Sequence, residues 1–251
     1  MMTKIKTAKE LEAMRESGRM LATVLQLLKG KVEAGISTKD LADIAASELK
    51  ALGGEPAFLG YQGFPDVICI SLNNEVVHGI PKPETIVEDG DIISLDFGVI
   101  YRGMVTDSAI SMIVGRASQK RHLELLADTE KAMHIGISEL HDQVRTGDIG
   151  SAIEQFLKRK KYGIVRDLVG HGVGHSLHED PNIPNYGRPD SGPYLSKGMT
   201  IAIEPMVTLG TDRVAIAPDG WTVMTLDGSW SAHFEHTVLI TEDGAEILTK
   251  L

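Results

Sequence analysis

The chain has 251 residues, of which 42% are hydrophobic and 24% charged, a composition ordinary for a globular protein with a sizeable core. The formal net charge of −10 argues against a DNA-binding protein, and no apolar run is long enough to span a membrane. The single cysteine, Cys69, excludes an intrachain disulfide, and the N-terminus lacks the apolar core of a signal peptide. We therefore expect a cytoplasmic protein with a single domain over residues 1–251.

Helical patterns open the chain and return in its middle. Apolar residues recur at helical spacing over residues 7–30, where Gly30 would stop the helix. A second helix is expected after Ser37, which can cap it, with Asp40 three residues on. Two further helices are expected near residues 118–144 and 148–161. These apolar stripes predict core packing and no particular function.

The last of these helices ends in the basic run "KRKK", Lys158 to Lys161. Cations suit a helix C-terminus because they complement the helix dipole, so a solvated helix end is the favoured interpretation. The alternative is a contact with RNA or another acidic surface, which would bring the protein to the ribosome.

Short segments rich in isoleucine and valine predict strands at residues 66–72, 91–99, 104–114, 199–207 and 233–241. Helices and strands mix without strict alternation, which indicates an α+β fold with a largely antiparallel sheet. The segment "DGDIISLD" resembles "SKGMTIAIE", and each is followed by a second strand that carries an acid. This echo hints at two duplicated halves.

Four acidic residues lie inside these apolar strands, where acids are rarely found without a partner. They are Asp96, Asp107, Glu204 and Glu235. One interpretation is four solvated acids on edge strands. The other is a shared site that holds cations.

Asp96 and Asp107 belong to neighbouring strands that a tight hairpin would join. A turn at Tyr101-Arg102 would place the two acids directly opposite each other, and a turn at Arg102-Gly103 would place them diagonally. Both turns leave the two carboxylates on one face of the sheet. Carboxylates this close repel each other, so a proton or a cation must lie between them.

A pair of divalent cations would balance all four carboxylates. Oxygen ligands suit Mn, and one imidazole extends the range to Fe, Co or Zn. Two metal ions about 3.5–4 Å apart are a known device for hydrolysis. The four acids together therefore favour a dinuclear hydrolase over the solvated interpretation.

The stretch "GHGVGHSLHEDP", residues 170–181, holds three histidines: His171, His175 and His178. Alternating glycines make a helix costly here, and HExxH is absent, so a helical zinc motif is excluded. In an extended chain His171 and His175 would point one way and His178 the other, unless the chain bends. The three histidines need not share one task.

Five separated blocks resemble the methionine aminopeptidases, which are pita-bread dinuclear metallopeptidases. The blocks are "NEVVHGIP" (74–81), "SLDFG" with "TDSA" (94–98 and 106–109), "GHGVGHSLHEDP" (170–181), "IAIEPMV" (201–207) and "SAHFEHTV" (231–238). Together they span nearly the whole chain, and the lack of a zinc-binding extension resembles the short type I form. The resemblance implies a curved antiparallel sheet flanked by helices, with two halves related by a pseudo-two-fold axis.

The resemblance also implies the activity and the residues that perform it. The activity would be removal of the initiator methionine from nascent polypeptides with a small second residue, by attack of a metal-bridging hydroxide. Asp96, Asp107, His171, Glu204 and Glu235 would hold the metals. Glu204 would also accept the proton of the attacking water, His178 would stabilise the oxyanion, and His78 would contact the scissile amide. No role is implied for His175. His236 would only orient a ligand, and His122, His134, His141 and His233 are expected to be surface or packing residues.

A pocket for the methionine side chain is implied at Phe58, Tyr61, Phe64, Cys69, Leu177 and Trp221. Plain core packing is an equal alternative for Phe64, and a simple turn role is the alternative for His78. Three places depart from the common family pattern: Phe97-Gly98 where many relatives have Val-Thr, His175 in place of a frequent arginine, and Phe58 in place of a cysteine. These departures bear on the width of the pocket.

Two other functions remain open for this sequence. One is an X-Pro aminopeptidase or prolidase of the same fold, although those enzymes usually carry an extra N-terminal domain. The other is a catalytically inactive binding protein, although this chain keeps all five implied ligands.

Overall fold

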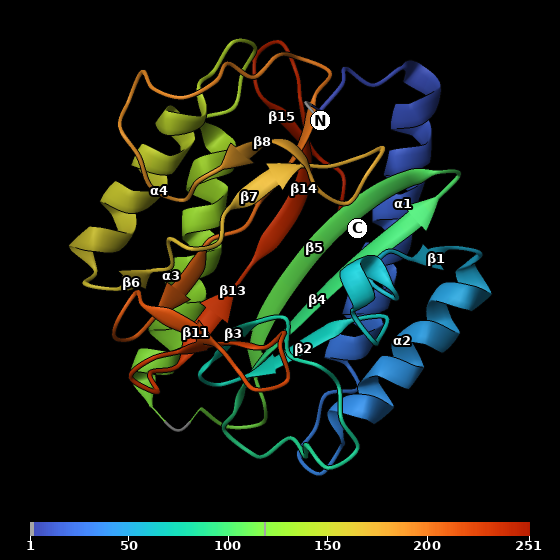
Figure 1. Cartoon of the computed structure of the whole chain (residues 1–251), viewed down its shortest axis with the longest axis vertical. Coiled ribbons are helices and arrows are strands. Elements are labelled where there is room, and N and C mark those ends of the chain that lie inside the picture. Colours follow the sequence, from blue (N-terminus) through green and yellow to red (C-terminus); the bar gives the residue numbers. More distant parts are fainter. Residues whose placement is uncertain (1–2, 118) are drawn as a thin grey trace.

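The computed structural model describes residues 3–117 and 119–251, which form an antiparallel sheet with two pairs of helices packed against it (Figure 1). The helices are α1 (Ala8–Lys29), α2 (Thr38–Leu52), α3 (Lys120–Ser138) and α4 (Thr146–Arg159), with a short 3-10 turn, η1, at Tyr61–Gly63. The strands are β1 (Glu55–Pro56), β2 (Cys69–Leu72), β3 (Glu75–Val77), β4 (Ile92–Tyr101), β5 (Met104–Ile113), β6 (Gly163–Ile164), β7 (Gly170–Gly172), β8 (Glu179–Ile183), β9 (Thr200–Ile203), β10 (Met206–Thr208), β11 (Val214–Ile216), β12 (Val223–Thr225), β13 (Ser231–His233), β14 (Glu235–Ile240) and β15 (Ala245–Ile247).

The helix predictions hold for the first two helices. Ser37 and Asp40 form the expected capping box at the start of α2, and Gly30 ends α1. The helix predicted at 118–144 ends earlier, at Ser138, and its predicted first residue, 118, lies outside the described residues. Gln143 takes a positive φ of 65°, which a helix cannot accommodate, so the chain turns before α4 begins.

The main sheet has nine strands in the order β1-β4-β5-β14-β9-β7-β8, with β2 added beside β4 and β15 beside β14. Two three-stranded sheets, β13-β10-β6 and β11-β12-β3, complete the described strands. The described strand pairs all run antiparallel, which confirms the α+β, antiparallel prediction.

Two predicted strands are each interrupted at one point. The segment 199–207 breaks at Glu204-Pro205, where proline has no N–H for a sheet ladder, and the segment 233–241 breaks at Phe234. The pairing keeps one register across the gap, because Ile203 pairs with His236 and Met206 pairs with His233. Glu204 therefore lies opposite Glu235, on the same face.

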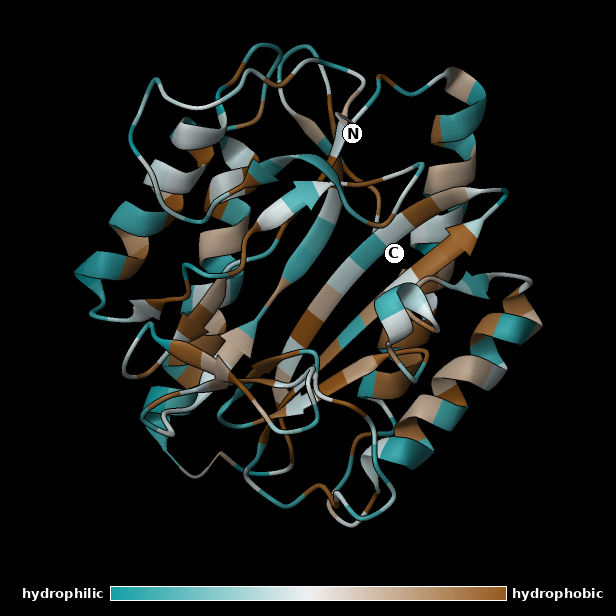
Figure 2. Ribbon diagram, in the orientation of Figure 1, coloured by the Kyte–Doolittle hydropathy of each residue, from teal (hydrophilic) through white to brown (hydrophobic). Residues whose placement is uncertain are grey.

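The molecule has two halves, each with a helix pair packed on its own strands. Helices α1 and α2 cover the β4–β5 hairpin and share one apolar cluster with β2 and β4, whereas α3 and α4 share another with β9 and β14. In Figure 2 each helix carries hydrophobic and hydrophilic residues side by side, as expected of helices that cover a sheet. Among the described residues, no helix combines the length and the apolar character needed to cross a bilayer.

Candidate metal centre and substrate pocket

The β4–β5 hairpin places the first two acids on one face of the sheet. Tyr101 pairs with Met104, so the turn is formed by Arg102 and Gly103, both with positive φ. Asp96 pairs with Ala109 and Asp107 pairs with Gly98, which makes the two acids diagonal neighbours. Of the two predicted turns, the structure selects Arg102-Gly103.

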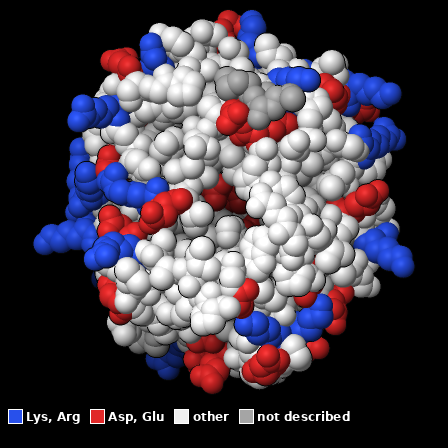
Figure 3. All heavy atoms as spheres, in the orientation of Figure 1, with Lys and Arg blue, Asp and Glu red and all other residues white. Residues whose placement is uncertain are grey.

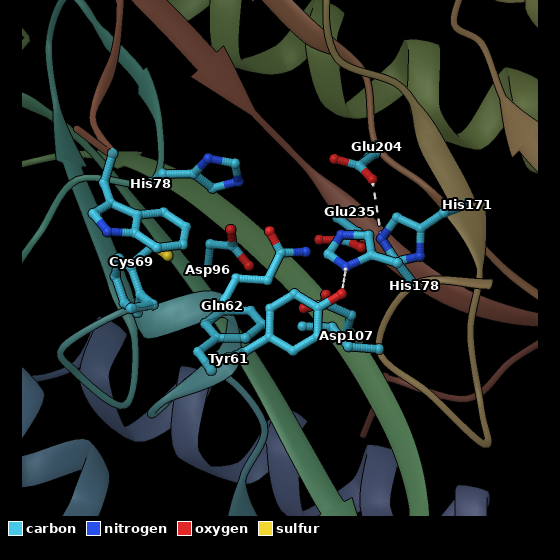
Figure 4. Close-up of a pocket in the computed structure, with 14 residues that line it drawn as sticks. Tyr61, Gln62, Cys69, His78, Asp96, Asp107, His171, His178, Glu204 and Glu235 are labelled. Atoms are coloured by element: carbon cyan, nitrogen blue, oxygen red, sulfur yellow. Dashed lines mark hydrogen bonds and ion pairs between the residues drawn. The ribbon is translucent and has the colours of Figure 1, made fainter. Parts of the chain in front are cut away.

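Glu204 and Glu235 join these acids from the other half of the molecule. Glu204 follows the end of β9, and Glu235 begins β14, which pairs with both β5 and β9. Asp96, Asp107 and Glu235 are 7%, 4% and 2% exposed, so the interpretation as solvated edge-strand acids is wrong. We call these four acids together with His171 the acidic wall (Figure 4).

Burial and mutual repulsion raise the proton affinity of this wall. Burial in a poorly solvated site and the neighbouring carboxylates raise the pKa of Asp96, Glu204 and Glu235 well above their usual range. Burial raises the pKa of Asp107 to about 7. Without a compensating positive charge, four such acids cannot all be ionised at neutral pH.

The unsatisfied oxygens of the acidic wall fit a cation. Asp96 Oδ1, Asp107 Oδ1 and Glu235 Oε1 are buried and have no hydrogen-bond partner among the described residues. Ligand atoms of Asp107, His171 and Glu235 lie within 4.8 Å of one another. Buried oxygens without donors are costly, and a divalent ion satisfies them.

His171 presents a free nitrogen to the acids. It lies in β7, and its Nδ1 is 2.9 Å from the Gly172 carbonyl oxygen, which makes Nδ1 the N–H donor. Nε2 therefore keeps its lone pair and lies 3.4 Å from Glu204 Oε1. Burial lowers the pKa of His171 to about 3, so the imidazole is neutral and able to bind a metal.

A bend after β7 separates the three histidines differently from the extended prediction. The His178 ring lies 4.2 Å from the His171 ring, centroid to centroid. His175 instead lies outside the pocket, where its Nε2 is 2.8 Å from Glu10 Oε1. The chain has the bend that the sequence left open as an alternative, and this bend brings His178 beside His171.

The N-terminal segment holds this bend in place. Glu179 accepts hydrogen bonds from the backbone N–H groups of His175 and Ser176. Its other oxygen pairs with the buried ammonium of Lys6 at 3.1 Å. A buried ion pair of this kind fixes geometry, here the path of the chain that carries His178.

Two further polar side chains line the same pocket as the acids. His178 Nδ1 lies 2.9 Å from the Tyr61 hydroxyl, and His78 lines the same pocket with a positive φ of 61°. Burial lowers the pKa of His78 to about 4 and also lowers that of His178. The strained backbone and the position in the pocket argue against a simple turn role for His78.

Six further side chains of the pocket form what we call the apolar wall: Phe58, Tyr61, Phe64, Cys69, Leu177 and Trp221. Phe64 lines the pocket and packs edge-on against Trp221, so it belongs to this wall as well as to a core cluster. Burial raises the pKa of the Cys69 thiol well above its usual range, so it is a small apolar group.

The departures at Phe58 and Gly98 are structurally linked. A Cβ atom at Gly98 would lie 2.6 Å from Phe58 Cε1 and 2.9 Å from Ala57 Cβ. The large ring at position 58 thus occupies the space that a side chain at position 98 would need. Sequence reasoning treated the two departures separately, because nothing in the linear pattern shows this contact.

Sequence reasoning missed one residue of the pocket, Gln62, which lines it beside Tyr61. It also gave no place beside the acids to His233, whose Nε2 lies 3.6 Å from Glu204 Oε2. Of the two roles expected for His233, surface or packing, its burial agrees with packing. The signal was the spacing of His233 and Glu235, because residues two apart on a strand share a face.

His236 lies on the opposite face of β14 from Glu235. Its Nδ1 is 2.8 Å from the Thr249 hydroxyl and 3.4 Å from the Ser108 hydroxyl. Ser108 in turn donates a hydrogen bond to the Glu235 carbonyl oxygen. Any effect of His236 on Glu235 therefore passes through the strand backbone.

The pocket opens to solvent on one face of the molecule. Figure 3 shows a hollow near the centre of this face with acidic side-chain atoms in its depth, while the lysines and arginines lie around the rim of the view.

Within the basic run Lys158 to Lys161, Lys158 pairs with Glu154 and Lys160 pairs with Asp128. These pairs favour the interpretation as a helix end.

Comparison with known proteins gives consistent matches along the whole chain. Residues 12–242 match the profile of metallopeptidase family M24. The chain is 45% identical to the methionine aminopeptidase of Mycoplasma capricolum, with 99% of both sequences covered. It is 46% identical to methionine aminopeptidase 1 of Bacillus subtilis, with 98% of both covered.

Solved structures agree with these matches. The methionine aminopeptidase of Thermotoga maritima superimposes with a TM-score of 0.98 at 44% identity, covering 100% of both chains. A prolidase from Pyrococcus furiosus has a TM-score of 0.79 at 24% identity, and the match covers 98% of this chain and 65% of that one. The second likeness shows a shared fold alone, and together the two confirm the pita-bread architecture.

Proposed function

The chain belongs to metallopeptidase family M24, and from this membership and the pocket we propose that it removes the N-terminal methionine of polypeptides whose second residue is small. The observation that carries the proposal is that the acidic wall and the apolar wall line one and the same pocket. A hydrolytic centre and a slot for an unbranched thioether thus face the same peptide bond.

The acidic wall would hold the metal ions. Asp96, Asp107, His171, Glu204 and Glu235 offer four carboxylates and one imidazole, which fits two divalent ions of Mn, Fe, Co or Zn. When bound, such ions supply Lewis-acid chemistry, which polarises a carbonyl group and lowers the pKa of water.

The protein side chains would then divide the remaining work. Glu204 accepts the proton of the attacking water at a carboxylate oxygen. With the Tyr61 hydroxyl donating to His178 Nδ1 across their 2.9 Å contact, the N–H of His178 would be at Nε2 and would donate to the oxyanion. His78 contacts the scissile amide and crowds a large second side chain. Its low pKa of about 4 keeps it neutral at working pH.

The methionine side chain would lie in the slot formed by the apolar wall. Phe64 and Trp221 pack edge-on with ring centroids 5.2 Å apart, and Cys69 contributes a small apolar surface beside them. Sulfur–aromatic contacts stabilise a thioether in such surroundings. Because Phe58 is large and buried, it narrows the slot.

The setting of this activity is also part of the proposal. We propose that the protein acts in the cytoplasm as a monomer, as one domain, on nascent chains at the ribosome. The absence of a long apolar helix among the described residues is compatible with this setting but does not select it.

Peptide cleavage by chelator-treated protein, resupplied with Mn, Fe, Co or Zn in turn, tests the proposal. The substrates are Met-Ala-Ser, Met-Lys-Ser and Ala-Pro peptides. We expect metal-dependent release of methionine from Met-Ala-Ser alone. Cleavage only before proline would make the protein a prolidase relative, and no cleavage with any metal would favour an inactive binding protein.

A further inference from the structure

His233 is a buried imidazole beside the acidic wall that the proposed mechanism does not use. Its side chain is 2% exposed, and neither ring nitrogen has a hydrogen-bond partner among the described residues. A buried polar group without a partner costs stability, so this one requires an explanation.

The strand register explains where His233 points. His233 ends β13 and Glu235 begins β14, and alternation along the strands places both side chains on one face. Glu204 lies opposite Glu235, which makes His233 its diagonal neighbour. Ligand atoms of Glu204, His233 and Glu235 lie within 4.8 Å of one another.

The two oxygens of Glu204 face two different histidines. Oε1 is 3.4 Å from His171 Nε2, and Oε2 is 3.6 Å from His233 Nε2. Because His171 Nε2 carries a lone pair, it cannot donate to Oε1, and both atoms can instead face one ion. Oε2 points away from that arrangement, toward His233.

We propose that His233 is a positioning residue of the metal centre, which donates a hydrogen bond from Nε2 to Glu204 Oε2 and thereby directs Oε1 toward the ion that His171 also binds. The contact shortens by about half an ångström to become a full hydrogen bond. Partners of this kind hold a ligating carboxylate in one orientation and raise metal affinity.

The surroundings select the proton position on His233. A neutral imidazole carries one N–H, and the Glu204 carboxylate is an acceptor 3.6 Å from Nε2. His78 and Glu235 also lie close to the ring. His78 is neutral at working pH, so it does not compete for this role.

The inference rests on the proposed function only in that the acidic wall binds metal. The test is calorimetric titration of the chelator-treated full chain with Mn and with Co, for the parent, His233→Leu and His233→Gln. The leucine removes the donor, whereas the glutamine amide keeps one at similar reach. His141→Gln is the matched control, since it makes the same change at an exposed histidine away from the pocket.

We expect His233→Leu to bind metal about 10- to 100-fold more weakly. His233→Gln and His141→Gln should bind like the parent, and the visible spectrum of bound Co should be the same in the parent and His233→Gln. Unfolding of each variant after chelation shows that the fold is intact. Should the leucine variant fail to fold, His233→Asn, whose shorter amide stops short of Glu204, replaces it.

Two results would overturn the inference. Unchanged affinity in His233→Leu would show that the contact does not position Glu204. Equal weakening in His233→Gln, with a changed Co spectrum, would make His233 a direct ligand instead. Cleavage of Met-Ala-Ser by the parent is measured in parallel. A parent chain whose metal affinity depends on His233 but which cleaves nothing would refute the proposed function alone.

Discussion

The two walls of the pocket are built from different kinds of backbone. The acidic wall stands on or beside paired strands, so each carboxylate is fixed by the register of a ladder. The apolar wall comes mostly from turns and bends: Tyr61 lies in η1, Leu177 in the bend after β7 and Trp221 in the turn before β12. Carboxylates that share cations must be held at fixed distances from one another, whereas the side chains around a flexible methionine can adjust their positions.

The largest effect should follow from breaking the acidic wall. Asp107→Asn and His171→Ala each remove a group that would bind metal, so we expect activity and metal affinity to fall by more than about 100-fold. Asp43→Asn, on the exposed side of α2, is the control and should change neither. Metal content by mass spectrometry and release of methionine are the measurements. Full aminopeptidase activity in either site variant would refute the proposed chemistry.

A substitution at His178, which lies beside His171 in the pocket, should slow the chemical step without changing metal binding. Loss of an oxyanion donor typically lowers kcat by about 100- to 1,000-fold, so we expect this for His178→Ala with metal content unchanged. Steady-state kinetics on Met-Ala-Ser give kcat and KM separately. A rise in KM alone would assign His178 to substrate binding and not to the oxyanion.

Substitutions at Phe58 and Gly98 should show that the packing of the apolar wall depends on the sizes of the side chains at both positions. Gly98→Thr alone forces a side chain against the Phe58 ring and should destabilise the fold by about 1–3 kcal/mol. Phe58→Cys opens that space, so the double variant should recover part of the loss. Urea unfolding of the four proteins measures the coupling. Additive free energies of unfolding would show that the two positions do not share this space.

The smallest effect should come from a substitution of Asp219, which accepts a hydrogen bond from the backbone N–H of Trp221. Although burial opposes its ionisation, hydrogen bonds from the backbone of Trp221 and Thr222 prevail and lower the pKa of Asp219 to about 2. The stabilisation is therefore present above the unfolded pKa of about 3.9 and is lost as the pH falls toward 2.

Asp219→Asn should thus cost about 1 kcal/mol of unfolding free energy at pH 5 and progressively less below pH 4. Urea unfolding of parent and variant across this range is the measurement, with the surface substitution Asp43→Asn as control. A gap that stays constant down to pH 2.5 would mean that the Asp219 charge is not the source of the stabilisation.

The parts of the site that depend on local sequence were predictable. Asp96 and Asp107 lie in one hairpin, so their shared face follows from strand alternation, and only the choice of turn remained open. Ser37 and Asp40 likewise predicted the start of α2, because a helix cap is a contact between residues that are close in sequence.

The parts that depend on distant pairing were not predictable from the residues alone. Glu204 and Glu235 meet because β9 pairs with β14, and the role of His178 depends on a bend that the glycines permit but do not dictate. A resemblance to a known family placed Glu204 and Glu235 in one site and implied the role of His178. It did not point to His233, whose position beside Glu204 depends on the register across two interrupted strands. The single-domain organisation stays a prediction.

The unbroken register across Glu204 and Phe234 has a consequence for insertions and deletions. Insertion of one residue between Ile203 and Glu204 would turn Glu204 to the far face of the sheet. The surface loop at residues 241–244, between β14 and β15, carries no such constraint. Length variation among descendants of this chain should therefore accumulate in that loop and be absent from the few residues around each acid.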